Sequence, residues 1–215
     1  MIAQSPAVDD IPVRIRFDYP QRMSRWLLWI KWLLVIPHLI VLYIYGILVG
    51  LTTFIAWFAI LFSGQYPRGL FNFAVGYFRW SLRVQAYFPL FLTDRYPPFG
   101  DGEHSVQLDV DYPAQQSRGV VLLRFLMFVP LFPFVWFLLA TMYLAGILLF
   151  PLYALLSWVW LCLLCTAQYP FGLYEFMAKV TAWQYRLNMW WYLLRDDWSM
   201  FGTKGVRLVE QQAIS

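Results

Sequence analysis

Two long segments of this chain contain no charged residue. Residues 32–67 lack Asp, Glu, Lys and Arg, and so do residues 125–174. Because the surface of a soluble domain carries charged side chains at short intervals, uncharged runs of 36 and 50 residues are typical of chains that lie in a lipid bilayer. The two segments therefore predict a membrane protein.

The composition agrees with a position at the membrane. Of the 215 residues, 21% are aromatic and only 13% are charged, and aromatic side chains are favoured at the boundary between water and lipid. The net charge of +4 comes from basic residues that are dispersed along the chain. This pattern favours contact with anionic lipid headgroups and argues against binding of nucleic acid.

The chain repeats an ordered set of short motifs. The Asp-Tyr-Pro motif at 18–20 returns at 111–113, a shift of 93 residues, and the Gln-Tyr-Pro motif at 65–67 returns at 168–170, a shift of 103. The ten additional residues fall in the second uncharged segment. We therefore expect two copies of one unit, 12–100 and 105–202, followed by a C-terminal strand or tail at 203–215.

Each unit opens with a segment in which apolar and polar residues alternate, at 13–18 and at 106–111. This period of two predicts a strand with one apolar face. If a two-fold axis relates the units, the strands pair antiparallel, and basic side chains of the first lie near acidic side chains of the second: Arg14 and Arg16 near Asp109 and Asp111. Residues 204–210 alternate in the same way and predict a third strand.

The long apolar segment of each unit predicts a transmembrane hairpin. As a helix, residues 24–64 would be roughly 60 Å long, enough for two crossings of a hydrocarbon core about 30 Å thick. Gly46 and Gly50 lie near its middle and are the expected turn. Residues 119–167 predict a second hairpin with a turn near 141–146. The alternative for each unit is one crossing plus a buried re-entrant piece.

An amphipathic helix follows each predicted hairpin. Arg68, Arg79 and Arg83 share one narrow stripe of the first helix, and Lys179 and Arg186 share one stripe of the second. A narrow charged stripe on a wide aromatic body is typical of a helix that lies in the membrane interface. The alternative is a further transmembrane helix with a buried polar seam.

Under this layout all sixteen Lys and Arg residues face one side of the membrane. The positive-inside rule then places both termini in the cytoplasm. The predicted fold class is therefore an all-α integral membrane protein, with four transmembrane helices in two duplicated hairpins, two amphipathic interfacial helices and a small cytoplasmic β-sheet.

Several segments of the first unit occur in an order that is familiar from one family. They are KWLLVIPH at 31–38, GQYPRGLF at 64–71, RWSLRV at 79–84 and LTDRYPPF at 92–99. Together they resemble the domain of unknown function DUF4389, an uncharacterised family of prokaryotic membrane proteins. The second unit is a degenerate match, because 196–201 departs from the segment at 93–99. The resemblance implies an integral membrane protein, and it implies no activity. Together with the predicted spans and orientation, it leads us to expect a multi-pass protein of the bacterial cytoplasmic (inner) membrane.

Basic residues beside the apolar segments are the candidate binding residues. Lys31 and Arg124 each follow a serine by seven residues and begin an uncharged run. Each either extends its side chain to the headgroups or forms a phosphate clamp with neighbouring arginines. The full set of candidate lipid- or phosphate-binding residues is Arg25, Lys31, Arg68, Arg79, Arg83, Arg118, Arg124, Lys179 and Arg186.

Other candidate chemistry is sparse. Cys162 and Cys165 would lie one helical turn apart, as small apolar packing residues or as a redox pair. His38 is expected to be a packing residue, and His104 is expected to be solvated in the linker. We find no nucleophile–His–acid set, phosphate-binding loop or zinc motif, so the sequence predicts no enzyme, no cofactor and no metal.

The sequence thus favours a non-enzymatic integral membrane module that binds anionic phospholipid or a partner membrane protein, as a scaffold or accessory subunit, or that forms a homo-oligomer. One alternative is a small transporter or channel along the repeat axis. Its apolar segments contain few of the polar groups that such a path needs. The other alternative is a membrane redox protein that uses Cys162 and Cys165.

Overall fold

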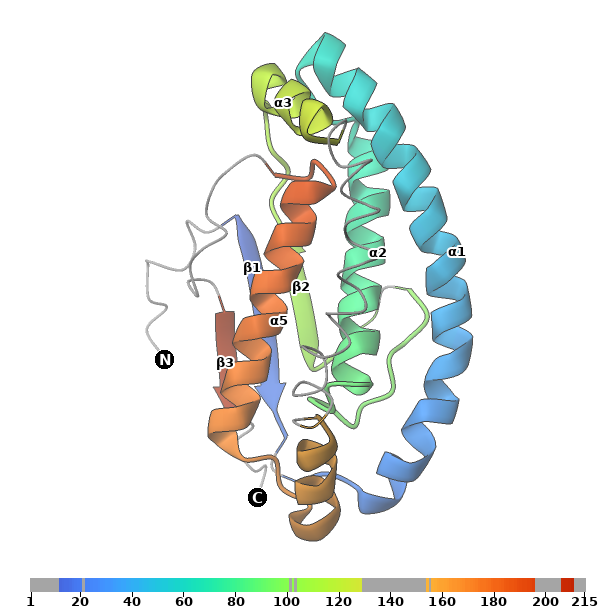
Figure 1. Cartoon of the computed structure of the whole chain (residues 1–215), viewed down its shortest axis with the longest axis vertical. Helices are drawn as coiled ribbons and strands as arrows, with labels where there is room; N and C mark the ends of the chain where they lie inside the picture. The colour runs from blue at the N-terminus through green and yellow to red at the C-terminus, as the bar shows by residue number, and fades with distance from the viewer. Residues whose placement is uncertain are drawn as a thin grey trace.

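The computed structural model describes residues 12–20, 22–100, 102, 104–128, 154, 156–195 and 206–210. Its helices and strands are, in order, β1 (Val13–Tyr19), α1 (Arg25–Ser63), α2 (Arg68–Tyr87), β2 (Val106–Val110), α3 (Arg118–Phe128), α5 (Phe171–Trp191) and β3 (Val206–Glu210). A shorter apolar helix, Leu156–Thr166, precedes α5. Figure 1 shows α1 as a long bow along one side of the molecule, with the sheet on the other side of α2.

The predicted hairpin of the first unit is wrong, because α1 is one continuous helix of 39 residues. Gly46 lies inside the helix, where a Cβ atom would stand 3.1 Å from the Tyr77 hydroxyl oxygen, so this glycine permits the close approach of α2. Gly50 also lies inside the helix. The chain turns at Gly64 instead, whose φ of 75° ends the helix in the left-handed conformation that glycine adopts without strain.

Four transmembrane helices are therefore not found among the residues that the structure describes. Within the described residues, α1 is the one helix that is long and apolar enough to cross a membrane, judged by length and composition. The predicted all-α fold with two duplicated transmembrane hairpins is corrected to a fold of helices packed on a β-sheet. The predicted second turn, near 141–146, lies outside the described residues.

The buried residues of α1 form a narrow seam. Leu28, Val35, Leu42, Val49 and Ala56 recur every seven residues. A repeat of seven keeps one line of side chains in contact with a partner helix that coils around it. Here the main partner is α2, α3 contacts the C-terminal part of the helix through Trp57 and Val121, and most other large apolar side chains of α1 are exposed.

The helix α2 is a core helix instead of the predicted interfacial helix. It lies between α1 and β2, and half of its twenty residues are buried, including Phe71, Phe78 and Trp80. Its aromatic body is therefore covered by protein. The helix α5 packs on β1 and β3, yet it still exposes several large apolar side chains: Phe171, Phe176, Val180, Trp183 and Trp191.

The sheet has the strand order β2-β1-β3, with β2 antiparallel and β3 parallel to β1. This confirms the predicted pairing of the first two strands and the predicted third strand. Ile15 pairs with Leu108 at the centre of the antiparallel register. The predicted charge pairing holds for Arg14, which donates to both carboxylate oxygens of Asp111 at 2.8 and 3.2 Å. Arg16 instead binds Asp18 on its own strand, at 2.9 Å.

The two halves of the chain are joined by pairs of hydrogen bonds, in which each half donates one bond and accepts the other. The amide of Met23 donates to the carbonyl oxygen of Ala167 at 2.9 Å, and the amide of Gln116 donates to that of Gly64 at 3.0 Å. In the same way, the Tyr19 hydroxyl donates to the carbonyl oxygen of Tyr169, and the Tyr112 hydroxyl donates to that of Tyr66. In each pair the donors are 93 residues apart and the acceptors 103, the two shifts seen in the sequence.

Candidate functional site

Lys31 lies on the α1 seam and is completely buried. Its Nζ atom is 2.7 Å from Oδ1 of Asp94 and donates to the carbonyl oxygen of Thr93 at 2.7 Å. The ammonium also lies 4.8 Å from the centre of the Tyr87 ring, within the range of a cation–π contact. This lysine therefore has an internal carboxylate partner, where the sequence suggested lipid phosphate.

Asp94 has a second role at the start of α1. Its Oδ2 atom accepts a hydrogen bond from the backbone amide of Ser24 at 2.5 Å. An acceptor at this place satisfies one of the backbone amides that an α-helix leaves unpaired at its N-terminus. The negative charge of the carboxylate also interacts favourably with the positive end of the helix dipole. The loop that carries Asp94 is thus fastened to the first turn of α1 by one carboxylate with two partners.

Arg124 occupies the equivalent position in the second half. Its guanidinium carbon lies 4.3 Å from the centre of the Trp190 ring, and Nη2 donates to the carbonyl oxygen of Arg195 at 3.0 Å. Trp190 follows Tyr87 by 103 residues, and Arg124 follows Lys31 by 93. Both halves therefore place a buried cation over an aromatic ring near the end of their amphipathic helix.

The charged stripe of α2 faces protein. Nε of Arg79 donates to the carbonyl oxygen of Leu108 at 2.9 Å, and its Nη2 lies 3.6 Å from Asp109. Arg83 is buried and donates to the carbonyl oxygen of Gly100 at 2.9 Å. In α5, Arg186 is also buried, and this burial lowers the pKa of its guanidinium. These arginines bind backbone and carboxylate groups within the chain or lie among buried side chains.

Three of the candidate arginines are exposed and lie near the two ends of α1. Arg25 is the first residue of α1 and donates to the carbonyl oxygen of Cys165 at 2.9 Å. At the other end, the Arg68 guanidinium lies 5.2 Å from the centre of the Tyr112 ring, and the Arg118 side chain lies beside Gly64. Lys179 is half-exposed and pairs with Glu175 at 2.6 Å.

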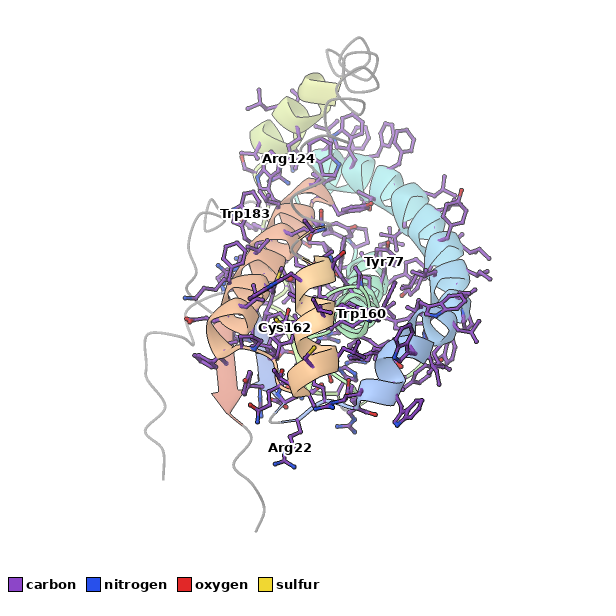
Figure 2. All side chains as sticks on the ribbon, turned by 60° about the horizontal axis from the view of Figure 1, so that its bottom comes forward. Arg22, Tyr77, Arg124, Trp160, Cys162 and Trp183 are labelled. Atoms are coloured by element: carbon purple, nitrogen blue, oxygen red, sulfur yellow. The ribbon has the colours of Figure 1, made fainter. Side chains whose placement is uncertain are left out.

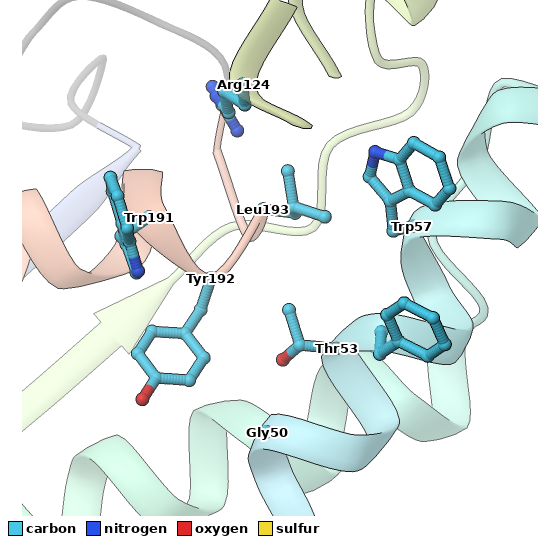
Figure 3. A pocket seen from close by; sticks show the side chains of 8 residues that line it. Gly50, Thr53, Trp57, Arg124, Trp191, Tyr192 and Leu193 are labelled. Atoms are coloured by element: carbon cyan, nitrogen blue, oxygen red, sulfur yellow. The ribbon is translucent and has the colours of Figure 1, made fainter. Parts of the chain in front are cut away.

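A cavity of about 390 Å³ lies between α1, α3 and the end of α5 (Figure 3). Trp57, Trp191 and Tyr192 form much of its wall, and Thr53 and Arg124 supply polar groups. Sequence reasoning missed this cavity, because its lining residues come from three segments that are each more than sixty residues from the next. Its size and aromatic lining are typical of pockets for small apolar molecules.

The two histidines are both buried. Nδ1 of His38 accepts a hydrogen bond from Trp80 Nε1 at 3.2 Å, and its ring stacks on Phe99 at 4.1 Å, which matches the expected packing role. His104 is not solvated as expected. Its Nδ1 accepts from the Val106 amide at 3.2 Å, so Nε2 carries the proton and donates to the carbonyl oxygen of Arg95 at 3.0 Å.

The cysteines lie one turn apart on the short helix before α5, and both thiols are free. Figure 2 labels Cys162 on this helix. Cys162 is partly buried and Cys165 is exposed. Across the part of the chain that the structure describes, no group of three or more His, Cys, Asp or Glu side chains is placed to hold a metal ion. The redox alternative therefore stays a prediction that depends on these two thiols alone.

Asp94 is the residue of the candidate site that sequence reasoning missed. It lies within the LTDRYPPF segment that carried part of the family resemblance, but nothing local connects it to Lys31, 63 residues earlier. The signal that could have revealed it is physical: a lysine inside a helix of this apolarity requires a carboxylate or a polar surface within reach.

Comparison with known proteins finds a family model that is similar to the segment containing this site. No curated protein and no solved structure matches the chain. A family model described as "Domain of unknown function (DUF4389)" matches residues 25–100. This range begins at the first residue of α1, includes α2 and ends just after the loop with Asp94. The segment that builds the Lys31–Asp94 pair is therefore the segment that is similar to DUF4389.

Proposed function

We propose that this chain is a non-enzymatic membrane-bound module that binds anionic phospholipid or a partner membrane protein, as a scaffold or accessory subunit. The observation that carries the proposal is the outer face of α1. Eighteen large apolar side chains of this one helix are exposed, among them Trp26, Leu33, Ile40 and Phe54. A soluble monomer rarely exposes a contiguous apolar surface of this extent, and a lipid bilayer is the solvent that suits it.

The charge distribution supports an anionic partner. Arg25, Arg68 and Arg118 are exposed near the two ends of α1, while the residues of α1 between Lys31 and Ser63 carry no charge. A basic residue near an anionic membrane surface contributes about 1 kcal/mol to binding. The buried cations Lys31, Arg83, Arg124 and Arg186 are removed from this role, and Arg79 is held by Leu108 and Asp109. The candidate set therefore narrows to the three exposed arginines and the half-exposed Lys179.

We also propose that residues 105–202 are a second, degenerate copy of the unit in the first half. The reciprocal hydrogen bonds between the halves support it, and so do the equivalent cation–ring contacts of Lys31 with Tyr87 and of Arg124 with Trp190. A two-fold axis between Ile15 and Leu108 would relate the copies. The proposed location is the bacterial cytoplasmic membrane, with the sheet on its cytoplasmic side.

Vesicle flotation tests the proposal. The purified full chain is mixed with vesicles of phosphatidylcholine alone or with an equimolar mixture of phosphatidylcholine and phosphatidylglycerol. We expect binding to both, with a clear preference for the anionic mixture. The variant Arg68→Gln/Arg118→Gln should lose about thirtyfold in that preference, because two basic residues that each contribute about 1 kcal/mol are removed.

The matched control is Arg14→Gln/Arg16→Gln, which removes the same charge from the outward face of the sheet and should keep the preference. Purification in mild detergent followed by native mass spectrometry tests whether the chain binds a partner membrane protein. Equal binding to both vesicle types, together with the absence of any co-purifying lipid or membrane protein, would overturn the proposed function.

A further inference from the structure

We propose that α1 lies parallel to the membrane plane, with its outer face inserted in one leaflet, and does not cross the bilayer. This inference rests on the proposed membrane binding and adds the orientation of the bound molecule. It follows from the groups that lie beside the middle of α1, from its length and from the position of the exposed charges.

The middle of α1 lies beside a charged part of the protein. Ile44 is the central residue of the helix, and the next residue, Tyr45, donates to the carbonyl oxygen of Phe73 at 2.8 Å and contacts the Tyr77 ring at 5.4 Å. Two residues after Tyr77, Arg79 reaches from α2 to the carbonyl oxygen of Leu108 and to Asp109 on β2. Measured along the axis of α1, the midpoint of the helix thus lies at about the position of the Arg79–Asp109 ion pair.

A crossing orientation would place that ion pair at the depth of the hydrocarbon core. Asp109 is 61% exposed, and its neighbours on the outward face of the sheet include the Arg14–Asp111 pair. Ionisable groups and open strand edges are strongly disfavoured in contact with lipid. If α1 lies in the membrane plane, all of these groups remain in water, because α2 separates them from α1.

The length of α1 agrees with this orientation. A helix of 39 residues is about 58 Å long, nearly twice the thickness of the hydrocarbon core. A helix in the interface has no such limit on its length, and its apolar face is typically buried 5–10 Å into the boundary of headgroups and acyl chains.

Aromatic and basic side chains are arranged as a single-leaflet site requires. Near the N-terminal end of α1, Trp26 and Trp29 are exposed, and the Trp29 ring meets Trp160 of the short apolar helix at 5.0 Å. Tryptophan is favoured at headgroup level. Arg25 and Arg118 lie near opposite ends of α1, and an in-plane helix brings both to the headgroups of the same leaflet. Figure 2 shows α1 as an arc on one side of the molecule, with α5 on the other side of α2.

A depth measurement along α1 tests the orientation. Leu33, Ile40, Ile47 and Phe54 are each more than half exposed and follow one another at intervals of seven residues, so they lie on one line. Each is replaced by cysteine in a Cys162→Ala/Cys165→Ala background and given a spin label. Accessibility to oxygen and to a water-soluble nickel chelate then reports the depth of each label in phosphatidylglycerol-containing vesicles. Gln107→Cys, on the outward face of the sheet, is the aqueous control.

We expect the four labels on α1 to report similar depths, within about 5 Å of one another, and the Gln107→Cys label to report water. A crossing helix would spread the four labels over about 30 Å along the membrane normal, with the labels at 40 and 47 about 10 Å deeper than those at 33 and 54. That profile would overturn the inference while leaving membrane binding intact. Failure to bind vesicles would overturn the proposed function as well. Spin–spin broadening between labels, with no access to lipid-phase oxygen, would show that a second copy of the chain covers this face and would also overturn the inference.

Discussion

A lysine ammonium in the seam between α1 and α2 is tolerated because the Asp94 carboxylate reaches it. Replacing Asp94 by Asn removes the negative charge and leaves Lys31 buried without its carboxylate. We expect a loss of about 2–3 kcal/mol in the free energy of unfolding, toward the lower end of the range for buried pairs because Asp94 is partly exposed. Chemical denaturation in detergent measures it.

The matched control for this pair is Glu175→Gln. The Lys179–Glu175 pair has an equally short contact, 2.6 Å, but both side chains are about 40% exposed. Its loss should cost no more than about 0.5 kcal/mol.

The double variant Lys31→Met/Asp94→Asn should recover part of the stability that Asp94→Asn loses, because the uncompensated charge is gone. Equal losses for Asp94→Asn and Glu175→Gln would contradict this account.

His104 makes the stability of the fold depend on pH. Burial is the largest cause that lowers the pKa of His104, and the positive charges of Arg83 and Arg95 act in the same direction, against Asp18 and the hydrogen bond to Arg95. The folded state therefore binds this proton less readily than the unfolded chain. The stabilisation is fully present above the unfolded pKa of 6.5 and is lost as the pH falls below it.

We expect the free energy of unfolding to fall by at most about 1.4 kcal/mol on this account between about pH 7.5 and 5.5. The variant His104→Gln should show a correspondingly weaker dependence on pH, measured by thermal or chemical unfolding in the same buffers. A pH dependence that is unchanged in His104→Gln would show that another group is responsible.

At the scale of the element, the two faces of α1 should respond differently to the same substitution. Val49 is fully buried in the seam, whereas Leu48 is 47% exposed. Val49→Asn buries an amide and loses apolar contacts, so we expect a loss of about 2–3 kcal/mol. Leu48→Asn should change stability in detergent by less than about 0.5 kcal/mol and should weaken vesicle binding instead. Equal destabilisation by both variants would contradict a one-sided seam.

The strands were predictable because their signal is local. Alternation in 13–18 and 106–111 marks which side chains face the core, and the repeated motifs suggested a two-fold relation between the two strands, so even the antiparallel pairing followed. The predicted hairpin was wrong because glycine can either form a turn or allow close packing inside a helix, and the sequence does not distinguish the two roles. Gly46 permits close packing of α2 inside a continuous helix, and Gly64 makes the turn.

The candidate site was predictable only in part, for a related reason. The stripe of Arg79 and Arg83 on α2 is visible in the sequence. The same pattern is expected whether these side chains bind lipid headgroups or backbone carbonyl groups of the protein. Which of the two it meets depends on β2 and on the loop that ends at Gly100, and these contacts arise from tertiary packing. For the same reason the exposed arginines could not be separated from the buried ones.

At the scale of the whole molecule, the two halves share the positions of their contacts but differ in chemistry. Lys31 and Arg124 hold equivalent places with different cations, and Arg68 at the start of α2 corresponds to Phe171 at the start of α5. Arg68 lies over Tyr112, and Phe171 meets Tyr19 edge-on at 5.4 Å. If the proposed two-fold relation holds, we expect the equivalent hydrogen bonds of the two halves to contribute about equally to stability.

The reciprocal tyrosines test this expectation. The Tyr19 and Tyr112 hydroxyls each donate to a backbone carbonyl in the other half, so Tyr19→Phe and Tyr112→Phe remove equivalent hydrogen bonds and keep the rings. We expect each variant to lose about 1 kcal/mol in the free energy of unfolding, and the two losses to agree within about 0.5 kcal/mol. Tyr43→Phe, at a 74% exposed position on α1, is the control and should have no effect. A large loss of stability for one variant and none for the other would show that the two hydrogen bonds contribute unequally to the free energy of unfolding. That result would contradict an equal contribution of the two halves, as the proposed two-fold relation predicts.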